Sequence, residues 1–148
     1  MNFASIIRKM LNFFAKIRMQ KNQLTLDIGK NSVASLWKIK TKTKNQLSIG
    51  TNSICGTHVS FERDEAQLTM GDRSFIGDGV FSIAMSISIG NDVMIAWGVT
   101  LSDHNSHSLV FSERANDVAQ WLDGKKEWDN VRIKPVIIRD KVWIGLHV

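Results

Sequence analysis

Cysteine, proline and tyrosine are nearly absent from this chain of 148 residues, which has one, one and none of them. The single cysteine, Cys55, excludes an internal disulfide framework and suits a reducing compartment. Ten glycines beside one proline are too few for a collagen-like chain. No apolar run approaches the roughly 18 residues that a membrane-spanning helix needs. We therefore expect one globular domain in the cytoplasm.

The net charge of +5 comes from the first 21 residues, which carry five basic side chains and no acidic one. The remainder of the chain has equal numbers of basic and acidic residues. Binding to duplex nucleic acid needs a continuous basic face, and a basic leader on a neutral body does not supply one. We expect no nucleic-acid partner.

Residues 3–19 have apolar side chains three and four positions apart, which is the spacing of an amphipathic helix. These side chains are Phe3, Ile6, Ile7, Met10, Leu11, Phe13, Phe14 and Ile17. We expect residues 1–22 to form this helix beside a main domain of residues 23–148. Basic residues interrupt the apolar ones, so the segment is not a secretory signal. Its apolar face either packs on the protein, on its own body or on a neighbouring subunit, or makes a peripheral contact with anionic lipid at the inner face of the membrane.

From about Leu24 the segments are short, rich in Ile, Val, Ser and Thr, and separated by Gly, Asn and Asp, which indicates β-structure with frequent turns. Aliphatic residues recur every six positions, at 70 and 76, at 89, 95 and 101, and at 138 and 144. Five of the repeated isoleucines are followed four positions later by a valine that is a second candidate for pointing into the core. These valines are Val80, Val93, Val99, Val142 and Val148. A step of six predicts triangular coils with one aliphatic side chain per face pointing inward, whereas a β-sandwich would show strict alternation.

The run "IGNDVMIAWGVTLSDHNSH", followed by "PVIIRDKVWIG", resembles the hexapeptide-repeat acyltransferases, which include galactoside, maltose and polysaccharide O-acetyltransferases. The resemblance covers roughly residues 47–148. It implies an all-β fold, a left-handed parallel β-helix, assembled as a homotrimer. It further implies acetyl-coenzyme A as the acyl donor, bound between subunits, a hydroxyl of a sugar or polysaccharide precursor as the acceptor, and no metal.

The six-residue phase is lost over about residues 102–135, where an insertion must leave the solenoid. Insertions of this kind usually lie on the binding face of a repeat protein. Within it, residues 112–122 are expected to form a short helix. Trp121 and Trp128 are candidates for binding the acceptor.

Two histidines, His104 and His107, lie at the start of the insertion in "DHNSH". Transfer of an acyl group to a hydroxyl needs a base with a near-neutral pKa, and an imidazole provides one. Asp103 and Asn105 are candidates for orienting the ring, and Asn105 is also a candidate for substrate binding. The resemblance implies that His104 is the catalytic base, while His107 either binds the acceptor or shapes the loop.

Two further tryptophans on the outside of the coils, Trp97 and Trp143, offer flat faces to a sugar ring or to pantetheine. The "VWIG" tryptophan, Trp143, resembles a residue that lines the active-site groove of galactoside-type enzymes. Arg139 and Lys141 are candidates, on position alone, for binding the phosphates of coenzyme A. Arg139 also departs from the small or acidic residue usual at its place in the hexad.

Two other functions stay open. The resembling enzymes continue beyond the point that corresponds to Val148, so we expect a C-terminally shortened solenoid, and such a chain could be a non-catalytic assembly module. The second is a zinc enzyme on the same fold, the gamma-class carbonic anhydrase, which requires three histidine ligands. The available histidines are His58, His104, His107 and His147.

Overall fold

The computed structural model describes residues 3–148, with side chains from Ile6 onward, so Met1, Asn2 and the side chain of Phe3 lie outside the described residues. The helices are α1 (Phe3–Lys21), the 3-10 helix η1 (Leu36–Lys38), α2 (Phe111–Arg114) and α3 (Asp117–Leu122). The strands are β1 (Thr25–Ile28), β2 (Val33–Ala34), β3 (Ile39–Lys40), β4 (Gln46–Ile49), β5 (Ile54–Cys55), β6 (His58–Phe61), β7 (Gln67–Met70), β8 (Phe75–Ile76), β9 (Val80–Ile83), β10 (Ser86–Ile89), β11 (Met94–Ile95), β12 (Thr100–Ser102), β13 (Val136–Ile138) and β14 (Trp143–Ile144).

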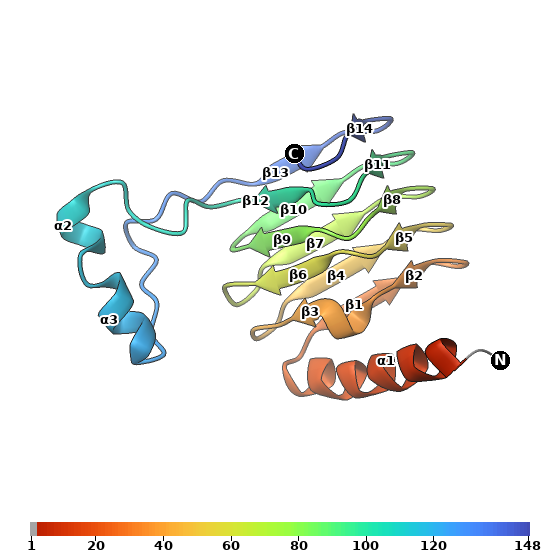
Figure 1. The fold of residues 1–148 in the computed structure, drawn as a ribbon, viewed down its shortest axis with the longest axis horizontal. Coiled ribbons are helices and arrows are strands. Elements are labelled where there is room, and N and C mark those ends of the chain that lie inside the picture. The colour runs from red at the N-terminus through yellow and green to blue at the C-terminus, as the bar shows by residue number, and fades with distance from the viewer. Residues whose placement is uncertain (1–2) are drawn as a thin grey trace.

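The strands form a parallel β-solenoid of three sheets (Figure 1). The sheets have the orders β1-β4-β7-β10-β13, β2-β5-β8-β11-β14 and β3-β6-β9-β12, and we name them the β1, β2 and β3 sheets. Each of the first four coils contributes one strand to every sheet, so successive strands along the chain belong to different sheets. This arrangement confirms the predicted solenoid with an N-terminal helix. Its left-handedness stays a prediction.

Equivalent inward residues of successive coils stack directly on one another. In the β1 sheet Leu47 pairs with Leu68, and Leu68 pairs with Ile87. All three side chains have 0% exposure. Inward residues also follow the six-residue step from sheet to sheet, at Ile83, Ile89, Ile95 and Leu101. The repeated isoleucines are therefore the core, as predicted.

One of the predicted inward valines, Val80, points outward instead and is 48% exposed, whereas Val93 and Val99 are buried. Val148 is 68% exposed, but it lies in register with Val99, since its carbonyl accepts the Thr100 amide as the Val99 carbonyl accepts the Val80 amide. Val80 pairs with the exposed Thr100, because Gly79 takes the inward place at this corner that Val99 holds one coil later. The sequence step of four failed here because the corner between β8 and β9 is one residue shorter than that between β11 and β12.

The corner between the β1 and β2 sheets, which we call the first corner, repeats a backbone conformation with positive φ in every coil. Its residues are Asn31, Asn52, Arg73, Asp92 and Lys141, with φ between 51° and 62°. Polar side chains tie each corner to the next, as when Asn91 Oδ1 accepts the Asp72 amide and Asp140 Oδ1 accepts the Asn91 amide. The coils also approach closely here, since a Cβ added to Gly71 would lie 2.6 Å from Asn91 Oδ1.

The N-terminal helix α1 covers the lower end of the solenoid (Figure 1). Ala15 and Met19 belong to the same buried cluster as the aliphatic ladders. Asn12 accepts the Leu36 amide at 3.0 Å and Arg18 donates to the Ile39 carbonyl at 2.6 Å. The helix therefore packs on the body of the protein, but not through the apolar face from which it was predicted. The contact uses Asn12, Ala15, Arg18 and Met19, whereas the predicted apolar side chains from Ile6 to Ile17 are exposed.

The insertion projects away from the solenoid as an arm, which we define as residues 103–135 (Figure 1). Its two ends run antiparallel and are joined by backbone hydrogen bonds from Asn105 to Arg132 and from Lys134 to Asp103. The single helix predicted at 112–122 is wrong, because the arm holds two short helices, α2 and α3. The break falls at Asn116, whose φ of −98° and ψ of 2° are not helical. Neither helix buries a residue.

The inward position of Cys55 makes its thiol a test of the core. Burial raises the pKa of Cys55 to about 11, and its side chain is 3% exposed. The thiolate is the reactive species, so we expect no reaction of the native protein with a thiol reagent at neutral pH. Unfolding in guanidinium should release one reactive thiol per chain. Labelling of the native protein at the rate of free cysteine would contradict this packing.

Candidate functional site

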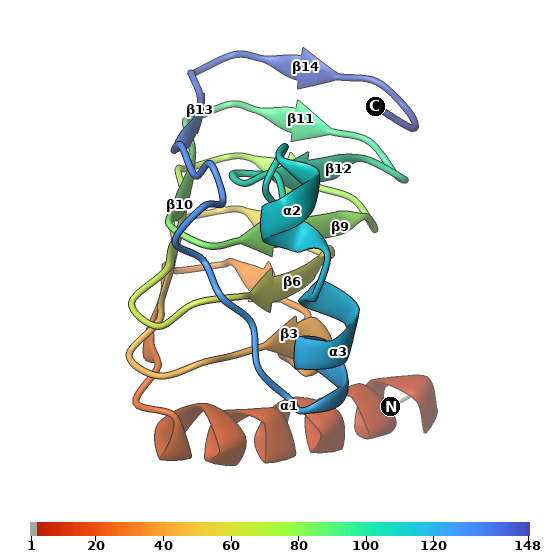
Figure 2. The same ribbon diagram turned by 90° about the vertical axis from the view of Figure 1, so that its left-hand side faces the viewer.

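A pocket of about 430 Å³ opens where the arm leaves the β3 sheet. Figure 2 views the arm, with the strands of the β3 sheet behind it. The residues that line the pocket come from the solenoid (Lys42, Glu62, Ser82), from the base of the arm (His104, Ser106) and from the returning segment of the arm (Trp121, Gly124, Lys125, Lys126, Trp128). The pocket therefore exists only because the arm folds back along the solenoid.

Asp103 anchors the arm and does not orient the histidine beside it. Its carboxylate is buried, and its two oxygens accept the amides of Ala84 at 2.7 Å and Met85 at 2.6 Å. Both amides belong to the connection between β9 and β10. Asp103 makes no hydrogen bond to the His104 ring, whose nitrogens pair with Ser82 and Ser106 instead, so the structure does not show the predicted partnership.

The ring of His104 is held by two serines, Ser82 of β9 and Ser106 of the arm. The backbone amide of Ser106 donates to Nδ1 at 3.0 Å, and Nε2 lies 3.0 Å from the Ser82 hydroxyl. A nitrogen that accepts an amide proton carries no proton itself, so the neutral ring has its proton on Nε2. His104 then donates to Ser82. Ser106, with a φ of 62°, adopts the left-handed backbone region to present this amide.

The surroundings of His104 favour the neutral imidazole. Burial lowers its pKa from the ordinary 6.5, and the charge of Lys126 lowers it further. The carboxylates of Asp103 and Glu62 act in the opposite direction without reversing the shift. A group with this pKa is unprotonated and can take part in proton transfer at neutral pH.

Two tryptophans from the arm form the outer wall of the pocket. Trp128 meets the His104 ring edge to face, with centroids 5.2 Å apart. Lys126 Nζ lies 4.1 Å from the Trp128 centroid and 5.7 Å from that of Trp121. Burial lowers the pKa of Lys126, while the charge of Glu62 opposes the shift. The wall thus combines aromatic faces with a cation.

His107 lies outside this pocket and braces the arm. Its Nδ1 pairs with the carboxylate of Asp117 at the start of α3, at 2.5 Å. Its ring packs against Trp121, with centroids 4.9 Å apart. Of the two roles predicted for His107, these contacts favour shaping the loop. Asn105 is exposed and makes only backbone hydrogen bonds within the arm.

The structure does not bring the predicted donor-binding residues to the His104 pocket. Arg139 and Lys141 lie at the first corner, and the exposed Trp143 begins β14 in the β2 sheet. Trp97, which is 61% exposed, lies at the corner between the β2 and β3 sheets. The pocket itself lies at the corner between the β3 and β1 sheets, so a single chain separates these residues from His104.

Seven of the ten lining residues were not singled out from the sequence: Lys42, Glu62, Ser82, Ser106, Gly124, Lys125 and Lys126. The strand register could have indicated one of them, Ser82. It pairs with Ser102, and His104 follows Ser102 by two positions, so Ser82 lies near His104. The other positions depend on the path of the arm, which has no repeat from which to infer it.

Histidines do not converge in the chain. His58 lies 3.7 Å from Asp78, whereas His147 lies over Gly98 near the last coil. Within residues 3–148 no group of three His, Cys, Asp or Glu side chains is placed to hold a metal ion. A zinc site of the carbonic anhydrase kind would need ligands from more than one chain.

Comparison with family models, curated proteins and solved structures finds no match to this chain. The resemblance to hexapeptide-repeat acyltransferases therefore stays a prediction that rests on the repeat and on "DHNSH".

The hydrogen bonds of His104 predict its protonation. In ¹⁵N NMR at neutral pH we expect Nδ1 to be unprotonated and Nε2 to carry the proton. Titration should give a midpoint below 6.5, and Lys126→Gln should raise it by removing a positive charge. The opposite tautomer, or a midpoint above 6.5, would contradict the geometry.

The two hydrogen bonds of Asp103 predict what holds the arm. Asp103→Asn offers one acceptor oxygen for two amides, so we expect a loss of about 1–3 kcal/mol in the free energy of unfolding. Hydrogen exchange at Ala84 and Met85 should accelerate. Asp123→Asn on the exposed part of the arm is the control. Unchanged protection of both amides in the Asp103 variant would show that the anchor lies elsewhere.

Proposed function

We propose that this protein transfers an acetyl group from acetyl-coenzyme A to a hydroxyl of a sugar or polysaccharide precursor, with His104 as the general base. The observation that carries the proposal is a neutral, partly buried imidazole in a pocket lined by tryptophan and charged side chains. The hexad repeat and the position of His104 after the "WGVT" coil support the same assignment.

The chemistry needs one proton acceptor. Nε2 of His104 takes the proton of the acceptor hydroxyl while its oxygen attacks the thioester carbonyl carbon. The carbon–sulfur bond then breaks, and the imidazolium returns its proton to the departing thiolate. A neutral imidazole contributes on the order of 10²- to 10⁴-fold to such a step.

This step requires a change of tautomer, because the free chain has its Nε2 proton directed at Ser82. The proton must move to Nδ1, which the Ser106 amide occupies in the free chain. We propose that acceptor binding displaces this amide. Its strained backbone, at a φ of 62°, lowers the cost of the movement.

Recognition of a sugar fits the composition of the pocket wall. Trp121 and Trp128 give apolar faces for the C–H side of a ring. Lys126, Lys42 and Glu62 supply donors and an acceptor for hydroxyl groups. These charges have both signs, so the pocket suits a polar acceptor rather than a fully apolar one.

Donor binding is proposed to need a homotrimer. The arm carries exposed apolar side chains, at Leu109, Val110, Phe111, Val118 and Leu122. Such a surface is costly to leave in water, and a neighbouring copy can cover it. We propose that Trp143 and Arg139 of the neighbouring copy complete the donor site.

A non-catalytic assembly module is the second candidate. The observation that favours it is that both ring nitrogens of His104 have partners inside the chain, Ser82 and Ser106. In this second candidate, the sole role of His104 is structural, and it fastens the arm to the β3 sheet.

Thiol release from acetyl-coenzyme A in the presence of sugar acceptors separates the two functions. We expect turnover by the wild type and a loss of about 10²-fold or more in His104→Ala. His58→Ala, which changes an exposed histidine outside the pocket, is the matched control. Turnover that His104→Ala leaves unchanged would refute the assignment of the base. No turnover with any acceptor would favour the assembly module.

A further inference from the structure

The helix α1 has two faces with opposite roles. Toward the solenoid it presents Asn12, Ala15 and Met19, and the last two are 6% and 2% exposed. These contacts fix the orientation of the helix. They leave most of its large apolar residues pointing away from the protein.

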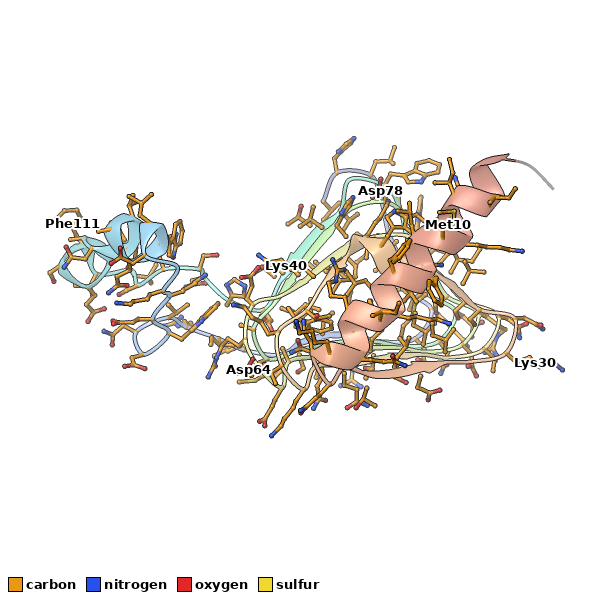
Figure 3. All side chains as sticks on the ribbon, turned by 90° about the horizontal axis from the view of Figure 1, so that it is seen from below. Met10, Lys30, Lys40, Asp64, Asp78 and Phe111 are labelled. Carbon is orange, nitrogen blue, oxygen red and sulfur yellow. The ribbon has the colours of Figure 1, made fainter. Side chains whose placement is uncertain are left out.

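The outward face of α1 is apolar. Residues three and four apart share one side of a helix, and the outward side carries a continuous series at those spacings. Its members are Ile6 (39% exposed), Met10 (55%), Phe13 (62%), Phe14 (61%) and Ile17 (50%). Figure 3 looks onto this helix from below, with Met10 labelled. A helix that only covered the end of a solenoid would be polar on this side.

Basic residues flank the outward apolar face of α1. The helix has no acidic residue in its first turn, and Arg18 and Lys21 lie in its last turn. Lys9 and Lys16 lie seven residues, or about two turns, apart along one edge of this face. Between residues 6 and 21 the only charges are positive.

We propose that α1 is a docking surface for an anionic membrane, on which the helix lies parallel to the bilayer plane. Apolar side chains enter the headgroup region while the lysines meet acidic lipid headgroups. The exposed apolar side chains extend along α1 from Ile6 to Ile17, which favours an orientation parallel to the bilayer. No helix within residues 3–148 is long and apolar enough to cross a membrane. Because α1 is already folded against η1, binding does not have to supply the free energy of helix formation.

The positive charge of α1 favours an anionic lipid surface over a second copy of the chain as the partner of its apolar face. Pairing two α1 helices would bring two sets of positive side chains together with no acidic residue on either helix to offset them. An anionic lipid surface neutralises the same side chains. This proposal does not depend on acetyl transfer.

Co-sedimentation with vesicles tests it. The full chain should bind vesicles that contain phosphatidylglycerol, should not bind pure phosphatidylcholine, and should be released by salt. Equal binding to both lipids, or none to either, would overturn the proposal.

Two pairs of variants assign the binding to the helix. Phe13→Gln combined with Ile17→Gln should weaken binding by about tenfold or more, since two apolar side chains no longer enter the lipid. Phe111→Gln, at an equally exposed aromatic residue on the arm (72%), should leave it unchanged. Lys16→Gln combined with Lys21→Gln should also weaken binding about tenfold, and Lys30→Gln should not.

Thermal unfolding should be nearly the same for all these variants, because every changed side chain is exposed. Sedimentation velocity without lipid completes the test. If the Phe13 and Ile17 variant alters self-association and not vesicle binding, the face belongs to a second copy and the proposal is wrong.

Discussion

Stacking of equivalent side chains in successive coils sets the position of everything outside the core. Leu68 and Ile87 pair across neighbouring strands about 4.8 Å apart, and the outward residues between them stack with the same register. On the β3 sheet this register places Ser82 beside Ser102. His104 follows two residues later, so its ring reaches the Ser82 hydroxyl of the preceding coil. The pocket is thus a consequence of the ladder, completed by an arm that leaves it.

Two segments do not follow the coil rule, and both expose apolar side chains. The arm buries none of the residues of α2 or α3 and depends on the anchor at Asp103. The helix α1 is fastened through Asn12 and Met19 while Phe13 faces outward. The solenoid is stabilised by the stacked aliphatic side chains that it buries. The exposed surfaces of the two appended segments are where contacts with other molecules are expected.

The repeat made most of the fold predictable, because a step of six specifies both the inward residue and the sheet. It failed at Val80, where a shorter corner moved the inward place to Gly79. The positive φ of Arg73 was not predictable from residue type, since arginine has no preference for it. In the site, the sequence singled out His104 and Trp128, which do meet.

What the sequence could not provide was the path of the arm and the hydrogen bonds it creates. The Lys126 position over Trp128 and the Ser106 amide at Nδ1 both depend on non-repeating backbone. The central claim is that the neutral ring of His104 accepts the substrate proton. The most direct test compares the pH dependence of thiol release with the NMR titration of His104 in the same protein. We expect one shared midpoint below 6.5, with the rate rising as pH rises through it. A rate that follows a different midpoint, or falls as His104 loses its proton, would show that His104 is not the base.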